Sequence, residues 1–290
     1  MKGIIIKGIS GFYYVKVEDT IFQCKARGIF KKDGIIPYVG DEVIIEIIAQ
    51  GEGEAVINQI CPRKNEFVRP SIANVDCFII VVAATRPEPN PEIIDRFLVM
   101  AEKSRTDIVV CINKIDLVSE EKLAALDEIY SNIYPVVHVC GSTGYGIEAF
   151  ANLLKGKKSA LAGPSGSGKS TLLNRLQLGL NVETGEIGHK SKRGKHTTRH
   201  VEIFQMDFGG MIFDTPGFTS FDILEADLEE LQFLYPEISA LVGGCKFDNC
   251  RHVNEPDCCV QEAVKTGKIH SSRYHSYVNQ YNDIQEKRKY

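Results

Sequence analysis

The sequence predicts a multidomain protein with three successive parts. Five short strand candidates in residues 1–64 indicate a small β-barrel of the oligonucleotide-binding (OB) type. Apolar strand candidates then alternate with helical segments over residues 65–222, which is typical of an α/β domain. The last part, residues 223–290, is polar and carries clustered cysteines and histidine, so we expect a mainly helical, zinc-binding domain there.

The composition is that of an ordinary globular protein. Of the 290 residues, 43% are hydrophobic and 25% are charged, and no apolar run approaches the roughly 18 residues of a membrane span. Five of the nine cysteines are scattered singly, as buried thiols of cytosolic proteins often are. The net charge of −4 hides basic stretches at 186–200 and from Lys268 onward, so it is a poor guide to partners. We therefore expect a cytoplasmic monomer with no membrane partner.

The strand candidates of the N-terminal part have turn signals such as KKDG and QGEGE between them. They read GIIIKGIS, FYYVKV, TIFQCKARG, DEVIIEII and EAVINQI. Five strands in so few residues fit a closed barrel, and the OB barrel is the commonest of that size. Another small β-barrel is the alternative.

The central part alternates between two kinds of segment. The buried-strand candidates are CFIIVVAA, DIVVCIN, PVVHVCG, KSALAG and MIFDTPG. Helical spacing appears in PEIIDRFLVMAEKS, SEEKLAALDEIYSN, GIEAFANLL and the segment after Gly168. This alternation predicts a mainly parallel, doubly wound sheet with helices on both faces.

A phosphate-binding loop is predicted at Gly163–Ser170, which reads GPSGSGKS between a strand candidate and a helix candidate. Its glycines allow backbone N–H groups to surround a β-phosphate at a helix N-terminus. In this pattern Lys169 reaches the β- and γ-phosphate oxygens, and the Ser170 hydroxyl is a Mg²⁺ ligand.

The base is predicted from Asn113–Asp116, which reads NKID at the end of a strand candidate. The Asp116 carboxylate can accept hydrogen bonds from N1–H and the 2-amino group of guanine, whereas adenine offers neither hydrogen on that edge. A site that leaves a buried polar group unpaired rejects the wrong ligand by about 10⁴-fold, so this residue selects guanine. We expect Asn113 to brace neighbouring loops and Lys114 to lie over the ring.

A third loop, Cys140–Gly146, reads CGSTGYG after the next strand candidate. GTPases usually place a Ser-Ala loop here, which contacts the guanine O6 through a backbone N–H. Cys-Gly replaces Ser-Ala in this chain, and a backbone contact tolerates the change. The expected GTP-binding residues are Asn113, Lys114, Ile115, Asp116, Gly163, Pro164, Ser165, Gly166, Ser167, Gly168, Lys169, Ser170, Thr171 and Gly217.

The metal and γ-phosphate side of the site is predicted from DTPG, residues 214–217. Asp214 is placed to hold the hydration shell of Mg²⁺, and the Gly217 N–H to meet the γ-phosphate. One of Thr197 and Thr198 should close over Mg²⁺, and we favour Thr198. The expected magnesium residues are therefore Ser170, Thr198 and Asp214.

No glutamine follows DTPG to orient the attacking water, because Phe218 occupies that position. We therefore expect slow intrinsic hydrolysis. His196 adjoins the switch threonines and is a candidate catalytic residue that positions water once a partner orders the loop. The alternative is a histidine that contacts only RNA or solvent.

A structural zinc site is predicted near the C-terminus. Three cysteines and one histidine follow the pattern C-x4-C-x-H-x5-C, a set suited to tetrahedral Zn²⁺ in a domain with little core. These ligands are Cys245, Cys250, His252 and Cys258. Cys259 is an alternative to Cys258.

The motifs stand in the order NKID, CGS, P-loop, threonine pair and DTPG, whereas ordinary GTPases begin with the P-loop and end with NKxD. This circularly permuted order, between an OB-like barrel and a Cys₃His module, closely resembles the RsgA/YjeQ/YloQ family of small-ribosomal-subunit-dependent GTPases. The segments RPSIANVD (69–76) and GKHTT (194–198) are also similar to that family. The resemblance covers the whole chain.

The resemblance implies a GTPase that binds the small ribosomal subunit and its rRNA late in assembly and is stimulated by it. It would use GTP and release GDP, with Mg²⁺ bound beside the nucleotide and one structural Zn²⁺. The residues alone support an RNA partner, because basic segments and a barrel face together supply phosphate contacts and base stacking. Two alternatives are a non-catalytic RNA-binding module locked by nucleotide, and a P-loop ATPase or kinase, which would have no use for NKID.

Overall fold

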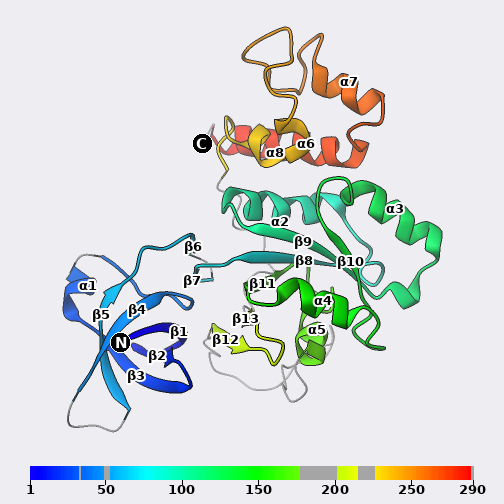
Figure 1. Cartoon of the computed structure of the whole chain (residues 1–290). Coiled ribbons are helices and arrows are strands. Elements are labelled where there is room, and N and C mark those ends of the chain that lie inside the picture. Colours follow the sequence, from blue (N-terminus) through cyan, green and yellow to red (C-terminus); the bar gives the residue numbers. More distant parts are fainter. Residues whose placement is uncertain (33, 49–52, 69, 177–200, 215–225, 289–290) are drawn as a thin grey trace, which may run out of the picture.

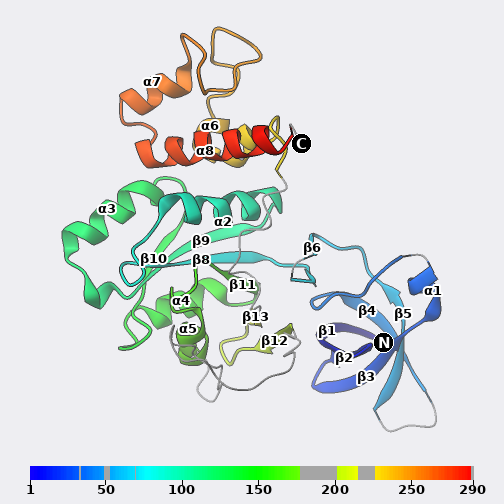
Figure 2. The same cartoon turned by 180° about the vertical axis from the view of Figure 1, so that it is seen from behind.

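The computed structural model describes residues 1–32, 34–48, 53–68, 70–176, 201–214 and 226–288. Three parts are visible in Figures 1 and 2: a barrel beside one edge of a central sheet, the sheet with its helices, and a group of helices above α2. The predicted three-part architecture is confirmed.

The N-terminal barrel closes because its last strand in spatial order pairs with its first. It consists of β1 (Lys2–Ile9), β2 (Phe12–Val17), β3 (Thr20–Ala26), β4 (Glu42–Ile47) and β5 (Glu54–Ile60), with α1 (Gly28–Lys32) after β3. The order β1-β2-β3-β5-β4 is completed by the β1–β4 pairing, and every pair is antiparallel except β3–β5. Alternating apolar side chains such as Ile5 and Val15 fill the interior, where both are fully buried. The OB-like prediction is thus confirmed.

The central sheet has the order β10-β9-β8-β11-β13-β12, and all of these strands are parallel except β12, which runs antiparallel to β13. The strands are β8 (Cys77–Ala83), β9 (Asp107–Asn113), β10 (Val136–His138), β11 (Lys158–Ala162), β12 (Glu202–Gln205) and β13 (Met211–Asp214). Sequence patterning did not predict β12, because only Ile203 of its four residues is buried and the segment therefore lacks an apolar run.

Helices cover both faces of the sheet, as expected for a doubly wound domain. On one face, α2 (Pro91–Lys103) and α3 (Glu120–Tyr130) pack against strand residues such as Phe78 and Val110. On the other face, α4 (Ile147–Leu154) and α5 (Lys169–Leu176) pack against the alternate residues Ile79 and Val109. A short 3-10 turn, η1 (Ile115–Leu117), follows β9.

The barrel is joined to the central sheet at two places. A short hairpin of β6 (Glu66–Phe67) and β7 (Ile72–Ala73) leads from one to the other. In addition, β1 pairs with β12 at Lys7 and Glu202, and the Lys7 ammonium lies 2.7 Å from the Glu202 carboxylate. The barrel therefore contacts the strand that precedes β13 along the chain.

The C-terminal part contains η2 (Leu231–Leu234), α6 (Pro236–Ser239), α7 (Cys259–Lys265) and α8 (Ser271–Lys287). Its small core includes Tyr235 and Tyr277, and Val99 of α2 belongs to the same cluster. Figure 1 shows α8 lying along α2. No helix in the described ranges is long and apolar enough to cross a membrane.

Candidate nucleotide and metal sites

The predicted nucleotide motifs meet at one edge of the central sheet. Because β8, β9, β10, β11 and β13 are parallel, their carboxyl ends lie together, and the motifs follow those ends. Asn113 ends β9, Ala162 ends β11 immediately before the P-loop, and Asp214 ends β13. The sheet thus brings together segments that are about a hundred positions apart in the sequence.

Two P-loop positions require glycine. Gly163 has φ +137°, and a Cβ there would lie 2.3 Å from the Val81 carbonyl oxygen. Gly168 has φ +97°, and a Cβ there would lie 2.2 Å from Nδ2 of Asn113. Since α5 begins at Lys169, the loop ends at a helix N-terminus, where free N–H groups favour phosphate.

The Lys169 side chain folds back into the loop. Its Nζ donates to the carbonyl oxygens of Gly163 at 2.8 Å and Pro164 at 2.9 Å. Burial lowers the pKa of Lys169 to about 8, because a charged ammonium loses hydration there. A phosphate group beside it would restore the preference for the charged form.

Asn113 links all three nucleotide loops and is 1% exposed. Its Nδ2 donates to the Ser167 carbonyl oxygen at 2.9 Å, in the P-loop. Its Oδ1 accepts from the backbone N–H of Lys114 at 2.8 Å and of Gly141 at 3.1 Å. The side chain therefore makes the bracing contacts expected from the sequence.

Lys114 crosses from the NKID segment to the P-loop. Its backbone is left-handed, with φ +63°, and its Nζ donates to the Gly166 carbonyl oxygen at 2.8 Å and to the Arg86 carbonyl oxygen. Burial lowers the pKa of Lys114, while the neighbouring Asp116 charge opposes this. The Arg86 contact was not expected from the sequence, since nothing local marks that carbonyl.

Asp116 is exposed and lies beside the third loop. The Cys140 thiol donates to Oδ1 of Asp116, with Sγ 3.0 Å from that oxygen. Arg175 of α5 donates to the Ser142 carbonyl oxygen at 2.9 Å, which ties the same loop to the P-loop helix. The sequence pointed to Cys140–Gly146 as a loop but not to this thiol contact.

At the metal side, Asp214 lies at the carboxyl end of β13. Burial raises the pKa of Asp214, and the negative charge of Glu202 on the neighbouring strand adds to this effect. A cation would offset both causes, which fits the expected Mg²⁺ role. The predicted His196, Thr197, Thr198, Gly217 and Phe218 lie outside the described residues.

A second candidate site is the Cys₃His cluster in the C-terminal part. The four ligand atoms of Cys245, Cys250, His252 and Cys258 all lie within 4.8 Å of one another. Nδ1 of His252 is 3.5, 3.5 and 3.4 Å from the three sulfurs in chain order, and the Cys245 and Cys258 sulfurs are 3.9 Å apart. Tetrahedral Zn²⁺ with Zn–S of about 2.3 Å and Zn–N of about 2.0 Å requires separations of roughly this size. The donor set therefore fits zinc.

Cys259 also lies beside this cluster, but it is not one of the four residues whose ligand atoms all lie within 4.8 Å of one another. Its Sγ is 3.1 Å from that of Cys245 and donates to the Leu241 carbonyl oxygen at 3.3 Å. Burial lowers the pKa of His252, which favours the neutral imidazole that a metal needs. The geometry therefore favours Cys258 over Cys259 as the fourth ligand.

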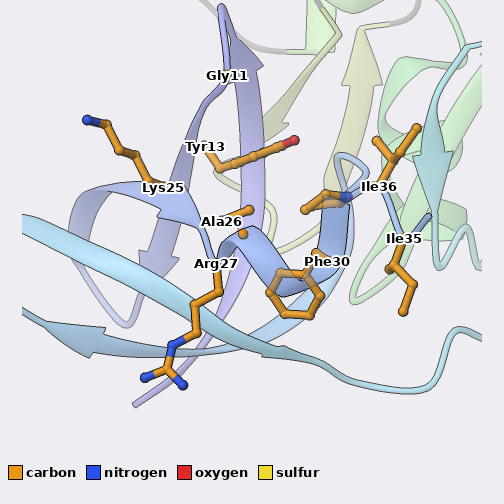
Figure 3. Close-up of a pocket in the computed structure, with 10 residues that line it drawn as sticks. Gly11, Tyr13, Lys25, Ala26, Arg27, Phe30, Ile35 and Ile36 are labelled. Atoms are coloured by element: carbon orange, nitrogen blue, oxygen red, sulfur yellow. The ribbon is translucent and has the colours of Figure 1, made fainter. Parts of the chain in front are cut away.

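A third feature is a pocket of about 340 Å³ on the barrel, where β2, β3 and α1 meet (Figure 3). Tyr13 and Phe30 lie within it, Ile35 and Ile36 close one side, and Lys25 and Arg27 extend from the other. None of the ten lining residues is acidic. The pocket thus combines aromatic and cationic side chains, which is typical of surfaces that bind single-stranded nucleic acid.

Comparison with protein families gives two matches. The family described as RsgA GTPase matches residues 60–224, and the RsgA N-terminal domain matches residues 2–57. A curated relative from Alkaliphilus metalliredigens, named small ribosomal subunit biogenesis GTPase RsgA, is 43% identical over 100% of this chain and 99% of its own length. A relative of the same name from Caldanaerobacter subterraneus is 46% identical over 100% of this chain and 97% of its own length.

Two solved structures superpose on nearly the whole chain. YjeQ from Thermotoga maritima superposes with a TM-score of 0.86 at 39% identity, covering 98% of both chains. YloQ, described as a circularly permuted GTPase, superposes with a TM-score of 0.83 at 34% identity, covering 99% of this chain and 95% of its own. The permuted order read from the motifs therefore has a structural counterpart.

Proposed function

The chain belongs to the RsgA GTPase family, and on that premise we propose that it hydrolyses GTP to GDP and phosphate while bound to the small ribosomal subunit, in the late assembly of that subunit. The proposal rests on the hydrogen bonds of the Asn113 side chain. They join the P-loop, the NKID segment and the third loop in one unit. Curated relatives named for small-subunit biogenesis support the ribosomal part.

In the proposed mechanism, backbone N–H groups of the P-loop bind the β-phosphate and Lys169 neutralises the phosphate charge. The Asp116 carboxylate accepts hydrogen bonds from N1–H and the 2-amino group of guanine, and Lys114 and Asn113 hold the loops around the base. Ser170, Thr198 and Asp214 would hold Mg²⁺, which supplies charge neutralisation on the phosphates. The Gly217 N–H would meet the γ-phosphate.

We propose that a histidine positions the water that attacks the γ-phosphate. Phe218 cannot hydrogen-bond to water, so we assign water positioning to His196, in a state that the small subunit stabilises. His196→Ala should lower subunit-stimulated turnover by roughly tenfold or more without weakening GTP binding. An undiminished stimulated rate would remove His196 from catalysis.

For the RNA interaction we propose that the barrel pocket and the basic segments contact rRNA. Lys25 of the pocket lies 5.0 Å from the Phe12 ring centroid, so a cation and an aromatic face stand side by side on the barrel. Phosphate contacts and base stacking of this kind bind RNA with a strong dependence on salt. We also propose that residues 1–64, 65–222 and 223–290 are the three domains, and that Zn²⁺ stabilises the last one.

Two measurements test the function. Asp116→Asn should reverse base preference from guanosine to xanthosine triphosphate, because the amide donates where the carboxylate accepts. Phosphate release under multiple-turnover conditions should be slow alone and rise strongly with small subunits but not with large ones. If neither the small nor the large subunit raises phosphate release, the non-catalytic alternative is favoured, in which bound nucleotide only stabilises an RNA-binding conformation.

A further inference from the structure

We propose that Cys245 and Cys259 form a reversible disulfide in the presence of peroxide, and that this bond removes one ligand from the Cys₃His site. The inference rests on the zinc site proposed above and is independent of GTP hydrolysis. Four ligands already complete a tetrahedral zinc site, so the Cys259 thiol is one that the metal does not need. Cys259 directly follows the ligand Cys258 and is the first residue of α7.

The sulfurs of Cys245 and Cys259 lie close enough to be joined. They are 3.1 Å apart, whereas the sulfurs of the two ligands Cys245 and Cys258 are 3.9 Å apart. A Cβ built at Gly244 would lie 3.5 Å from Sγ of Cys259, so the start of α7 packs directly against the segment that carries Cys245. A movement of about 1 Å brings the pair to the S–S bond length of about 2.05 Å.

Solvent reaches this pair of thiols more readily than the rest of the cluster. Cys245 and Cys259 are both partly exposed, whereas Cys250 and Cys258 are buried. His252 is buried as well, with 1% of its surface exposed. Among the proposed zinc ligands, Cys245 is therefore the one that a small oxidant in solution meets first, and it has a second thiol beside it.

Hydrogen peroxide supplies the oxidising equivalents for the bond. The Cys245 thiolate attacks one peroxide oxygen, the O–O bond breaks, hydroxide leaves, and Cys245 becomes a sulfenic acid. The Cys259 sulfur then attacks the sulfenic sulfur. The S–S bond forms as the S–OH bond breaks, and the hydroxyl leaves with the Cys259 proton as water. The two sulfurs lose two electrons, which the peroxide has taken up, and a dithiol reductant reverses the change.

Loss of Cys245 leaves three of the four ligands in a segment that packs against α8. The Tyr274 hydroxyl donates to the His252 carbonyl oxygen at 2.9 Å, and the Tyr277 hydroxyl donates to the Arg251 carbonyl oxygen at 2.6 Å. Because metal binding contributes directly to the folding of small domains, release of zinc should destabilise this segment. The pair Cys245 and Cys259 thus makes the C-terminal part sensitive to oxidation.

The test compares the full chain with two variants. Cys259→Ser removes the second sulfur of the pair. Cys61→Ser is the matched control, because Cys61 is also partly exposed but follows β5 of the barrel. Each protein is purified in reducing agent, its zinc content is measured, and it is then treated with increasing doses of hydrogen peroxide. A chromogenic chelator measures the zinc released, and free thiols are alkylated before digestion with trypsin.

The digest identifies the sulfurs that are joined. Trypsin cleaves after Lys246, Arg251 and Lys265, so Cys245 and Cys250 fall in different peptides, while Cys258 and Cys259 share the peptide 252–265. In that peptide, mass-spectrometric fragmentation shows which of the two neighbouring cysteines carries the alkyl group and which carries the disulfide.

We expect the oxidised parent to release its zinc and to contain Cys245 joined to Cys259. Dithiothreitol with added zinc should restore the original zinc content. At the peroxide dose that releases half of the parent's zinc, Cys259→Ser should keep most of its own, because no thiol is left 3.1 Å from Cys245 to complete the disulfide. Cys61→Ser should match the parent.

Equal zinc release from the parent and Cys259→Ser would overturn the inference, and so would a main product in which Cys245 is joined to Cys250 or Cys258. If Cys259→Ser does not fold, the peptides of the oxidised parent decide alone. A failure of the proposed function is seen before any peroxide is added: the reduced parent would then contain no zinc, or small subunits would not stimulate its phosphate release.

Discussion

Arg273 donates a hydrogen bond of 2.6 Å to Oδ1 of Asp95, and neither side chain reaches solvent. The same guanidinium donates through Nε to Glu237 at 2.8 Å. Asp95 is on α2, Arg273 on α8 and Glu237 on α6, so one buried cation joins the C-terminal part to the central domain. Any displacement of the C-terminal part must carry α2 with it or break this buried cluster.

Arg273→Ala should destabilise the fold strongly, because it leaves two carboxylates buried without their partner. We expect a loss of about 3–5 kcal/mol in the free energy of unfolding, measured by urea denaturation. Arg96→Ala is the matched control: Arg96 also bridges α2 and α8, through Asp283, but its side chain is 22% exposed. It should cost less than about 1 kcal/mol, and equal losses at the two positions would contradict the argument from burial.

The second prediction concerns the Cys₃His cluster. The purified chain should contain one zinc ion by elemental mass spectrometry, and Cys250→Ser should contain none, because three ligands hold zinc weakly. Cys259→Ser is the control, since Cys259 lies beside the cluster but its thiol donates to the Leu241 carbonyl oxygen. Loss of zinc in both variants would mean that Cys259 takes part in the site. GDP binding should survive in both, because the C-terminal part packs against α2 whereas the nucleotide loops follow the carboxyl ends of the strands.

Sequence patterns predicted the parts of the site that local geometry determines. The P-loop and NKID each occupy a few consecutive residues that directly follow a strand, so their roles could be assigned without knowing the fold. The zinc ligands are similar, because all four lie within 14 consecutive positions, from Cys245 to Cys258. The apolar runs that became β8, β9 and β11 are easy to recognise, because β8 is buried along its whole length and β9 and β11 are buried after their first residue.

Contacts between distant segments could not be predicted in the same way. Lys7 and Glu202 are 195 positions apart, and Arg273 and Asp95 are 178 apart. Nothing near Arg273 in SSRYHSYVNQ distinguishes a buried arginine from an exposed one. The contact between Cys140 and Asp116 was missed for a related reason, since two parallel strands must first be placed side by side before their loops can meet.

The third prediction concerns the contact between the barrel and the sheet at Gly40. Its φ is +96°, and a Cβ there would lie 2.1 Å from the Ala73 carbonyl oxygen and 2.8 Å from Cζ of Phe213, the residue before Asp214. Gly40→Ala should therefore force the barrel away from the sheet and destabilise the chain by more than about 3 kcal/mol in thermal or urea unfolding.

Gly34→Ala separates steric clash from backbone strain. Gly34 also has a positive φ, +70°, but no atom lies within 4 Å of a Cβ built there. The control should lose only about 1–2 kcal/mol, the cost of a left-handed backbone at a non-glycine residue. Similar losses in the two variants would show that the close approach to Ala73 and Phe213 contributes nothing.

The last prediction concerns the pH dependence of stability without nucleotide. Burial lowers the pKa of Lys169 to about 8 in the folded chain, from an ordinary value of 10.5. Between these two values the unfolded chain binds more protons than the folded one, so this group makes stability rise with pH across that window. Below pH 8 both states are charged, and the full cost of burying the ammonium is present. Lys169→Met removes that cost and should be more stable than the parent at pH 7, by roughly 1–3 kcal/mol.

The advantage of Lys169→Met over the parent should shrink as pH rises from 8 toward 10.5, because the parent then folds with a neutral amine. Urea unfolding at several pH values measures it. Lys157→Met is the control, because the pKa of Lys157 is shifted in the opposite direction: a hydrogen bond to Asp107 raises it. Replacing Lys157 should therefore give no gain in the free energy of unfolding at pH 7. A constant difference between Lys169→Met and the parent from pH 7 to pH 10 would contradict the pKa argument and indicate a packing effect instead.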